Sequence, residues 1–166
     1  MTMVLTNFVD TWYHRDKMPT KTTTPAAENI ATAFYKLIST SSAGGQVTIV
    51  PNSWVQSVPQ TTFVSNINAA FRKKTFEPLA NALGDAILTY LNDCTPNTLY
   101  PDSHPATSIS AAYGLYPYLK TYVVGNIKNA YKGKERFGKG LLEWMTTEIT
   151  VNYPDPPGGR GELLLV

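Results

Sequence analysis

The stretch TPAAENIATAFYKLIST, residues 24–40, decides the fold class because its apolar residues recur at helical spacing. One stripe comprises Ile30, Ala33, Phe34, Leu37 and Ile38. A proline occupies the first helical position, where its missing N–H costs nothing, and a threonine precedes it as a cap. The stretch therefore predicts an amphipathic helix that buries one face.

Similar apolar stripes predict helices over much of the remaining chain. They fall at residues 2–13, 60–77 and 78–91, at residues 107–131, where Pro117 predicts a kink or two shorter helices, and around residues 137–145. Short runs rich in β-branched or aromatic residues predict strands at residues 46–50, 98–101 and 148–153. We therefore expect a mostly helical α+β fold, a single domain with a few short strands.

The length of 166 residues suits one domain, in which we expect three parts. Residues 1–24 are expected to form an N-terminal segment or arm, since the end of this segment is polar and lacks any period. Residues 25–154 form the predicted helical core domain with its short strands. Residues 155–166 begin with a Pro/Gly-rich spacer that does not suit regular structure, and they form an extended C-terminal tail.

The composition excludes several classes of protein. With 43% hydrophobic and 16% charged residues the chain can bury a core, which excludes a disordered chain. The net charge of +2 is too small for a surface that binds polyanions all over. No apolar run approaches the ~20 residues that span a bilayer, so we expect no membrane partner. Cys94 has no cysteine to pair with, and with only His14 and His104 we expect no metal site.

The surface chemistry predicted from the composition is unusual. Charged residues fall below the ~25% of an ordinary soluble domain, whereas the chain has 10 tyrosines and 3 tryptophans. Protein interfaces are enriched in these aromatic residues and depleted in charge. The composition therefore predicts a surface that a partner covers, and a β-rich monomer with threonine on its solvent-facing sides is the alternative left open.

No stretch contains a complete catalytic or nucleotide-binding motif. The Gly-Lys-Gly of residues 138–140 lacks the spacing of a phosphate-binding loop, and we expect its glycines to let helices approach closely. Residues 102–104 place Asp, Ser and His side by side, which is ordinary turn chemistry rather than triad geometry. We expect no enzyme activity, catalytic residue or cofactor. A small hydrolase that uses His104 with Ser103 or Cys94 is an alternative.

One basic stretch keeps nucleic-acid binding open as a further alternative. It comprises Lys128, Lys132, Lys134, Arg136 and Lys139, accompanied by Arg72, Lys73 and Lys74. Tyr122 and Tyr131 lie close by in the sequence, and their rings could stack on bases. Glu135 dilutes the positive charge, and solvated lysines at an exposed helix end are a commoner cause of such a pattern. Nucleic acid is therefore not the partner that we expect.

The two ends of the chain are the candidate docking sites. The last four residues, Leu163, Leu164, Leu165 and Val166, are consecutive apolar residues that something must cover. Either the chain covers them itself as a last strand, or the tail adds a strand to a neighbour's sheet. The N-terminal segment, with Phe8 and Trp12, leaves the same two alternatives open.

Two segments carry a resemblance to a known class of protein. ANALGDAI at residues 80–87 and TEITVNYPDPPG at residues 147–158 resemble, in style, small virion structural proteins of tailed bacteriophages, of the neck, tail or baseplate type. The resemblance implies a structural subunit that contacts other virion or assembly proteins and forms a homo-oligomer or ring. It carries over no catalytic or ligand residue. We expect this role, in a virion or otherwise in the cytoplasm, with a nucleic-acid-binding or adaptor module as the alternative.

Overall fold

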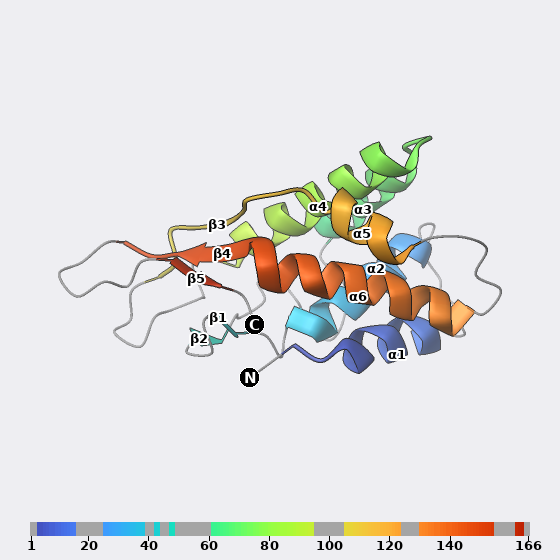
Figure 1. Cartoon of the computed structure of the whole chain (residues 1–166), viewed down its shortest axis with the longest axis horizontal. Coiled ribbons are helices and arrows are strands. Elements are labelled where there is room, and N and C mark those ends of the chain that lie inside the picture. Colours follow the sequence, from blue (N-terminus) through green and yellow to red (C-terminus); the bar gives the residue numbers. More distant parts are fainter. Residues whose placement is uncertain are drawn as a thin grey trace.

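The computed structural model describes residues 3–15, 25–38, 42–43, 47–48, 61–94, 105–123, 130–154 and 162–164. Within these residues the helices are α1 (Leu5–Arg15), α2 (Pro25–Ile38), α3 (Thr61–Phe71), α4 (Phe76–Asp93), α5 (Tyr116–Tyr122) and α6 (Ala130–Glu148). The strands are β1 (Ser42–Ala43), β2 (Val47–Thr48), β3 (Ser108–Ala111), β4 (Ile149–Asn152) and β5 (Glu162–Leu164). The predicted fold, a mostly helical α+β domain with a few short strands, is confirmed (Figure 1).

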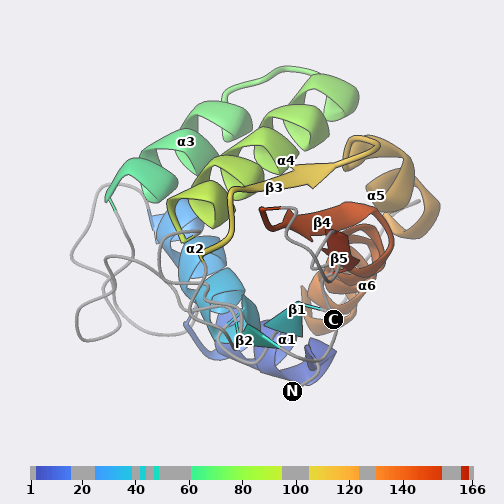
Figure 2. The same ribbon diagram turned by 90° about the vertical axis from the view of Figure 1, so that its left-hand side faces the viewer.

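Helix α2 lies between two groups of helices, with α1 packed on one side and α3 on the other (Figure 2). It is the helix predicted from residues 24–40, and its apolar stripe is buried as expected. The ring of Phe34 lies 5.5 Å from that of Phe63 on α3 and 6.3 Å from that of Tyr90 on α4, measured between centroids. This aromatic cluster joins three helices into one core.

Helix α6 runs along the long axis of the molecule and leads directly into β4 (Figure 1). Both α1 and α5 pack against it. A Cβ on Gly138 would lie 2.7 Å from Leu5 Cδ1 of α1, and one on Gly140 would lie 3.0 Å from the carbonyl oxygen of Tyr118 in α5. The prediction that these glycines let helices approach closely is confirmed.

The N-terminal boundary of the core differs from the prediction. Residues 1–24 were expected to form a segment or arm outside the core domain, but α1 packs against both α2 and α6. Met3, Phe8 and Val9 are buried in the same cluster as the residues of α2. Burial of these side chains favours α1 packed on the core over α1 as an exposed arm, because each large apolar side chain is stabilised by roughly 1.5–3 kcal/mol when it is fully covered.

The boundary between α3 and α4 also differs. The helix predicted over residues 60–77 ends at Phe71, and α4 begins at Phe76, so that Pro78 lies within the first turn of α4. A proline is tolerated there because the N–H groups of a first helical turn have no partner within the helix. The break therefore falls at the polar turn of residues 72–75, and not at the proline.

Residues 108–111 form strand β3, which corrects the helix predicted over residues 107–131. Successive side chains of a strand face opposite sides. Along this strand Ile109 is buried, whereas its neighbours Ser108 and Ser110 are not. Helix α5 begins at Tyr116, and Pro117 lies in its first turn and produces no kink. The local sequence fits either period, and the antiparallel pairing with β4 decides between them.

The larger sheet has the strand order β3-β4-β5, and both pairs are antiparallel. Val151 pairs with Ile109 on one side and with Leu163 on the other. Asn92, near the end of α4, covers the outer edge of β3: its Nδ2 donates to the Ile109 carbonyl at 2.6 Å, and its Oδ1 accepts from the Ile109 N–H at 2.9 Å. A side-chain amide thus replaces a neighbouring strand. The smaller sheet pairs β1 with β2.

Candidate functional site

The N-terminal docking candidates lie against α6 of the same chain. Phe8 is 0% exposed, and its ring stacks on that of Phe137 with 6.3 Å between centroids. Trp12, which is half-buried, meets Phe137 edge-on at 5.3 Å. Of the two alternatives for the N-terminal segment, the structure shows cover by the same chain, because Phe8 and Trp12 pack against Phe137 of α6.

The basic stretch on α6 is partly used within the chain. Lys134 Nζ lies 5.1 Å from the ring centroid of Trp12, and burial lowers the pKa of this lysine. Lys139 forms an ion pair with Glu135, with 3.2 Å between Nζ and the carboxylate. Lys128 lies outside the described residues. Fewer cations than the sequence suggested therefore remain for a phosphate backbone.

Tyr122 and Tyr131, whose rings could stack on bases under the nucleic-acid alternative, are both hydrogen-bonded to carboxylates. The hydroxyl of Tyr131 donates to Asp10 at 2.8 Å, and this hydrogen bond raises the pKa of Tyr131. The ring of Tyr131 also meets that of Tyr13 edge-on, with 5.2 Å between centroids. A hydrogen bond to Glu143 raises the pKa of Tyr122. Each of these two hydrogen bonds thus joins a tyrosine hydroxyl to a carboxylate on a neighbouring helix.

The C-terminal docking candidates divide into two pairs. Leu163 and Leu164 belong to β5, whose backbone pairs with β4 of the same chain. In this register Leu163 lies opposite Val151, which is buried, and Leu164 lies opposite Thr150. Residues 165–166 lie outside the described residues. Of the two alternatives for the tail, the structure shows the strand added to the chain's own sheet.

Of the residues considered for nucleophilic chemistry, the structure describes only Cys94. Residues 102–104 lie outside the described part of the chain. Cys94 is buried, and its Sγ donates to the carbonyl of Tyr90 at 3.3 Å. Burial also raises the pKa of the Tyr90 hydroxyl. Cys94 thus sits in a closed environment at the end of α4.

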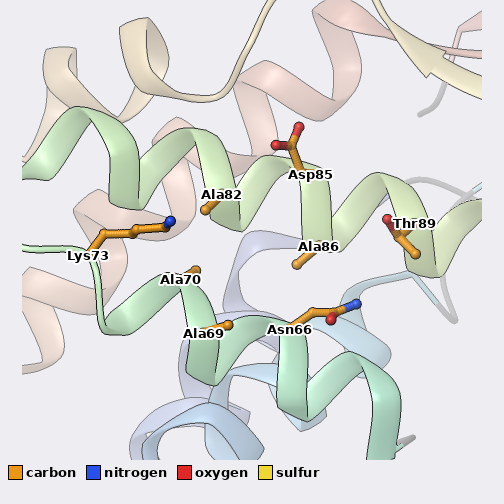
Figure 3. A pocket seen from close by; sticks show the side chains of 8 residues that line it. All are labelled: Asn66, Ala69, Ala70, Lys73, Ala82, Asp85, Ala86 and Thr89. Carbon is orange, nitrogen blue, oxygen red and sulfur yellow. The ribbon is translucent and has the colours of Figure 1, made fainter.

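The surface that sequence reasoning missed lies along α4. A groove of about 360 Å³ separates the outer sides of α3 and α4 (Figure 3). Its lining comprises Asn66, Ala69, Ala70, Lys73, Ala82, Asp85, Ala86 and Thr89. In Figure 3 Lys73 lies at one end of the groove and Thr89 at the other, with alanines between them. The groove is open to solvent, and alanine methyl groups form part of its lining.

A second groove, of about 280 Å³, lies on the other side of α4. It is lined by Asn81, Gly84, Asp85, Leu88, Gly114, Leu115 and Trp144. The indole N–H of Trp144 donates to the carbonyl of Tyr113 at 2.7 Å, while the Tyr113 side chain is 70% exposed. This hydrogen bond fixes the backbone that presents an exposed tyrosine beside the groove.

We call these two grooves and Tyr113 the α4 face. Among the described side chains that line the grooves, only Lys73 and Asp85 carry a charge. The sequence held a faint signal of this face, since Asn81, Asp85 and Thr89 recur every four residues between the apolar positions of α4. That spacing is typical of any solvated helix side, and the hollows beside it become visible only when α3 and α5 are placed.

The described residues contain neither a cluster of metal-ligating side chains nor a helix that could span a membrane. No three His, Cys, Asp or Glu side chains among them gather closely enough to hold a metal ion. None of the described helices is both long and apolar enough to cross a bilayer.

Comparison with known proteins gives no relative. No family model matches the chain, and neither the curated proteins nor the solved structures include a significant match.

Proposed function

We propose that this chain is a structural subunit of a larger protein assembly, and that it associates with further copies through the α4 face. The assembly fits the neck, tail or baseplate of a tailed-bacteriophage virion. One observation carries the proposal: the α4 face combines two grooves, two charged groove-lining side chains and an exposed tyrosine.

The chemistry of this face supports an interface rather than an ordinary solvated surface. Interface centres are depleted in charge and enriched in tyrosine. Tyr113 is 70% exposed, yet the bond from Trp144 to its carbonyl already orders the local backbone. A partner that covers this side chain gains apolar area at roughly 25 cal/mol per Å² with little further ordering of the backbone.

The virion location rests on the resemblance of two segments. Residues 80–87 lie in α4 and supply residues of both grooves, including Ala82 and Asp85. Residues 147–158 include β4, the central strand of the larger sheet. The segments that resemble virion proteins therefore include part of the surface proposed for assembly.

Light scattering of the purified chain over a range of concentrations tests this proposal. We expect a mass that rises above the 18.3 kDa of one chain. Tyr113→Ser should weaken the association about tenfold, the loss typical of an exposed aromatic that an interface covers. Val4→Ser is the matched control, because Val4 is 44% exposed and directly precedes α1, away from the α4 face. A chain that stays at 18.3 kDa at every concentration would contradict the proposal.

Nucleic-acid binding stays a second candidate because of one observation. Arg72, Lys73 and Lys74 are consecutive and exposed in the turn between α3 and α4. Contacts from such a turn to phosphates would release counterions, so binding would weaken steeply as salt rises. A gel-shift titration over ionic strength distinguishes this function from assembly, and a chain that shifts no DNA or RNA at low salt excludes it.

A further inference from the structure

The groove between α3 and α4 holds two opposite charges that the described structure leaves unpaired. Lys73 and Asp85 both line the groove and are both exposed. Neither makes an ion pair or a side-chain hydrogen bond with any residue that the structure describes. Between them the lining is mainly alanine, with Ala82 on the α4 side (Figure 3).

A two-fold axis through such a groove pairs these charges twice. In a contact related by a two-fold axis, if residue i of one copy meets residue j of the other, then j also meets i. An axis near Ala82 would place α4 antiparallel to the same helix of a second copy. Lys73 would then face the partner's Asp85, and Asp85 would face the partner's Lys73. The small alanine side chains allow the two helices to approach closely, because helix spacing depends on the side chains at the contact.

We infer that the groove between α3 and α4 binds a second copy of this chain across a two-fold axis, with Lys73 opposite the partner's Asp85. This inference rests on the proposed function and deepens it, since it names the partner and the geometry of one contact. The mixed charges favour a second copy over nucleic acid, because Asp85 is one of the residues that line the groove and its carboxylate repels phosphates.

Charge reversal at the two positions provides the test. In a Lys73→Glu homodimer the new carboxylate faces the partner's Asp85 at both contacts, and in an Asp85→Lys homodimer two lysines face each other twice. Each variant alone should therefore dimerise at least about tenfold more weakly than the wild type, since opposed like charges are strongly unfavourable. In an equimolar mixture of the two variants both contacts are attractive, so we expect a mixed dimer with affinity near that of the wild type.

Sedimentation velocity on each variant and on their mixture measures this directly. Lys74→Glu and Glu77→Lys are the matched controls, because both residues are exposed nearby and neither lines the groove. Circular dichroism verifies that all variants remain folded, which we expect because Lys73 and Asp85 are exposed.

Four outcomes separate the possibilities. Weak single variants and a restored mixture support the two-fold contact. A wild-type chain that associates while both variants and their mixture behave like it overturns this inference and leaves assembly standing. A wild-type chain that never exceeds 18.3 kDa overturns both proposals. If Lys73→Glu and Lys74→Glu each reduce binding to DNA or RNA and leave the mass unchanged, the turn is a nucleic-acid contact and the dimer contact is excluded.

Discussion

The two long sides of the helical body use large and small side chains in opposite ways. On the α1 side, Phe8 and Trp12 are covered by Phe137 of α6, and the cluster is closed by the chain itself. On the α4 side, the groove lining is mostly small or polar, and Lys73 and Asp85 have no partner among the described residues. The aromatic cluster thus lies on the side that is already packed within the chain.

This difference shows why apolar residues near a chain terminus are weak evidence that the terminus binds a partner. A terminal helix with large apolar side chains is drawn onto its own domain whenever a complementary face lies within reach, because burial stabilises it wherever the cover comes from. On the α4 face, Lys73 and Asp85 lie beside small residues and have no such cover from the described part of the chain. We therefore expect changes on the α1 side to alter stability alone, and changes on the α4 face to alter association alone.

Phe8→Ala tests the covered side and has the largest expected effect. Phe8 is 0% exposed, and truncating a buried phenylalanine leaves a cavity between α1 and α6. The free energy of unfolding should fall by about 3–5 kcal/mol, measured by urea titration. The mass at matched concentration should not change while the variant remains folded.

Val4→Ser is the control for this change, because Val4 directly precedes the same helix but is 44% exposed. Its effect should stay within about 0.5 kcal/mol. If Phe8→Ala also cost less than about 1 kcal/mol, α1 would behave as the arm first predicted for residues 1–24, and the distinction between the two sides would fail.

Removal of residues 155–166 tests whether the tail stabilises its own chain or takes part in association. It deletes β5 and leaves β4 as the edge of the larger sheet. Three cross-strand pairs are lost, and at roughly 0.2–1 kcal/mol each the free energy of unfolding should fall by about 1–2 kcal/mol. Light scattering should give the same association as the full chain. A truncated chain that keeps its stability but no longer associates would mean that the tail pairs with a neighbour.

The sequence predicted the helical elements whose periodicity agrees with their tertiary environment. Helix α2 has a buried stripe at the expected spacing, and β4 alternates buried and half-buried residues next to a proline. The predictions failed where the local sequence was compatible with two kinds of secondary structure. Residues 108–111 fit a helix or a strand, and only pairing with β4 and the amide of Asn92 selects the strand.

The candidate site was predicted less well than the fold. Sequence reasoning chose the apolar ends, because consecutive leucines and aromatic residues are visible in one dimension. The α4 face joins residues from α3, α4, α6 and the segment before α5, which are far apart in the chain. Ala82 and Asp85 acquire meaning only when α3 lies beside them, and no local pattern predicts that neighbour.

Tyr118→Phe is the mildest test of the covered side, and it depends on pH. The hydroxyl of Tyr118 donates a hydrogen bond to Glu148, a carboxylate that is only 8% exposed. This bond raises the pKa of Tyr118 from 10.0 to about 12. Because the folded-state pKa is the higher one, the stabilisation is complete below about pH 10 and is lost as the pH rises towards 12.

The variant should therefore unfold with about 1 kcal/mol less free energy than the wild type at neutral pH, since one hydrogen bond to a mostly buried carboxylate is lost. The gap should close between pH 10 and 12, as followed by urea titrations at several pH values. Tyr113→Phe removes a hydroxyl from an exposed ring and should show almost no gap at any of these pH values. A gap for Tyr118→Phe that stays constant through this window would mean that the contact with Glu148 does not hold the tyrosine proton. The helix α5 would then depend on apolar contacts such as that of Leu119, which is fully buried against α6.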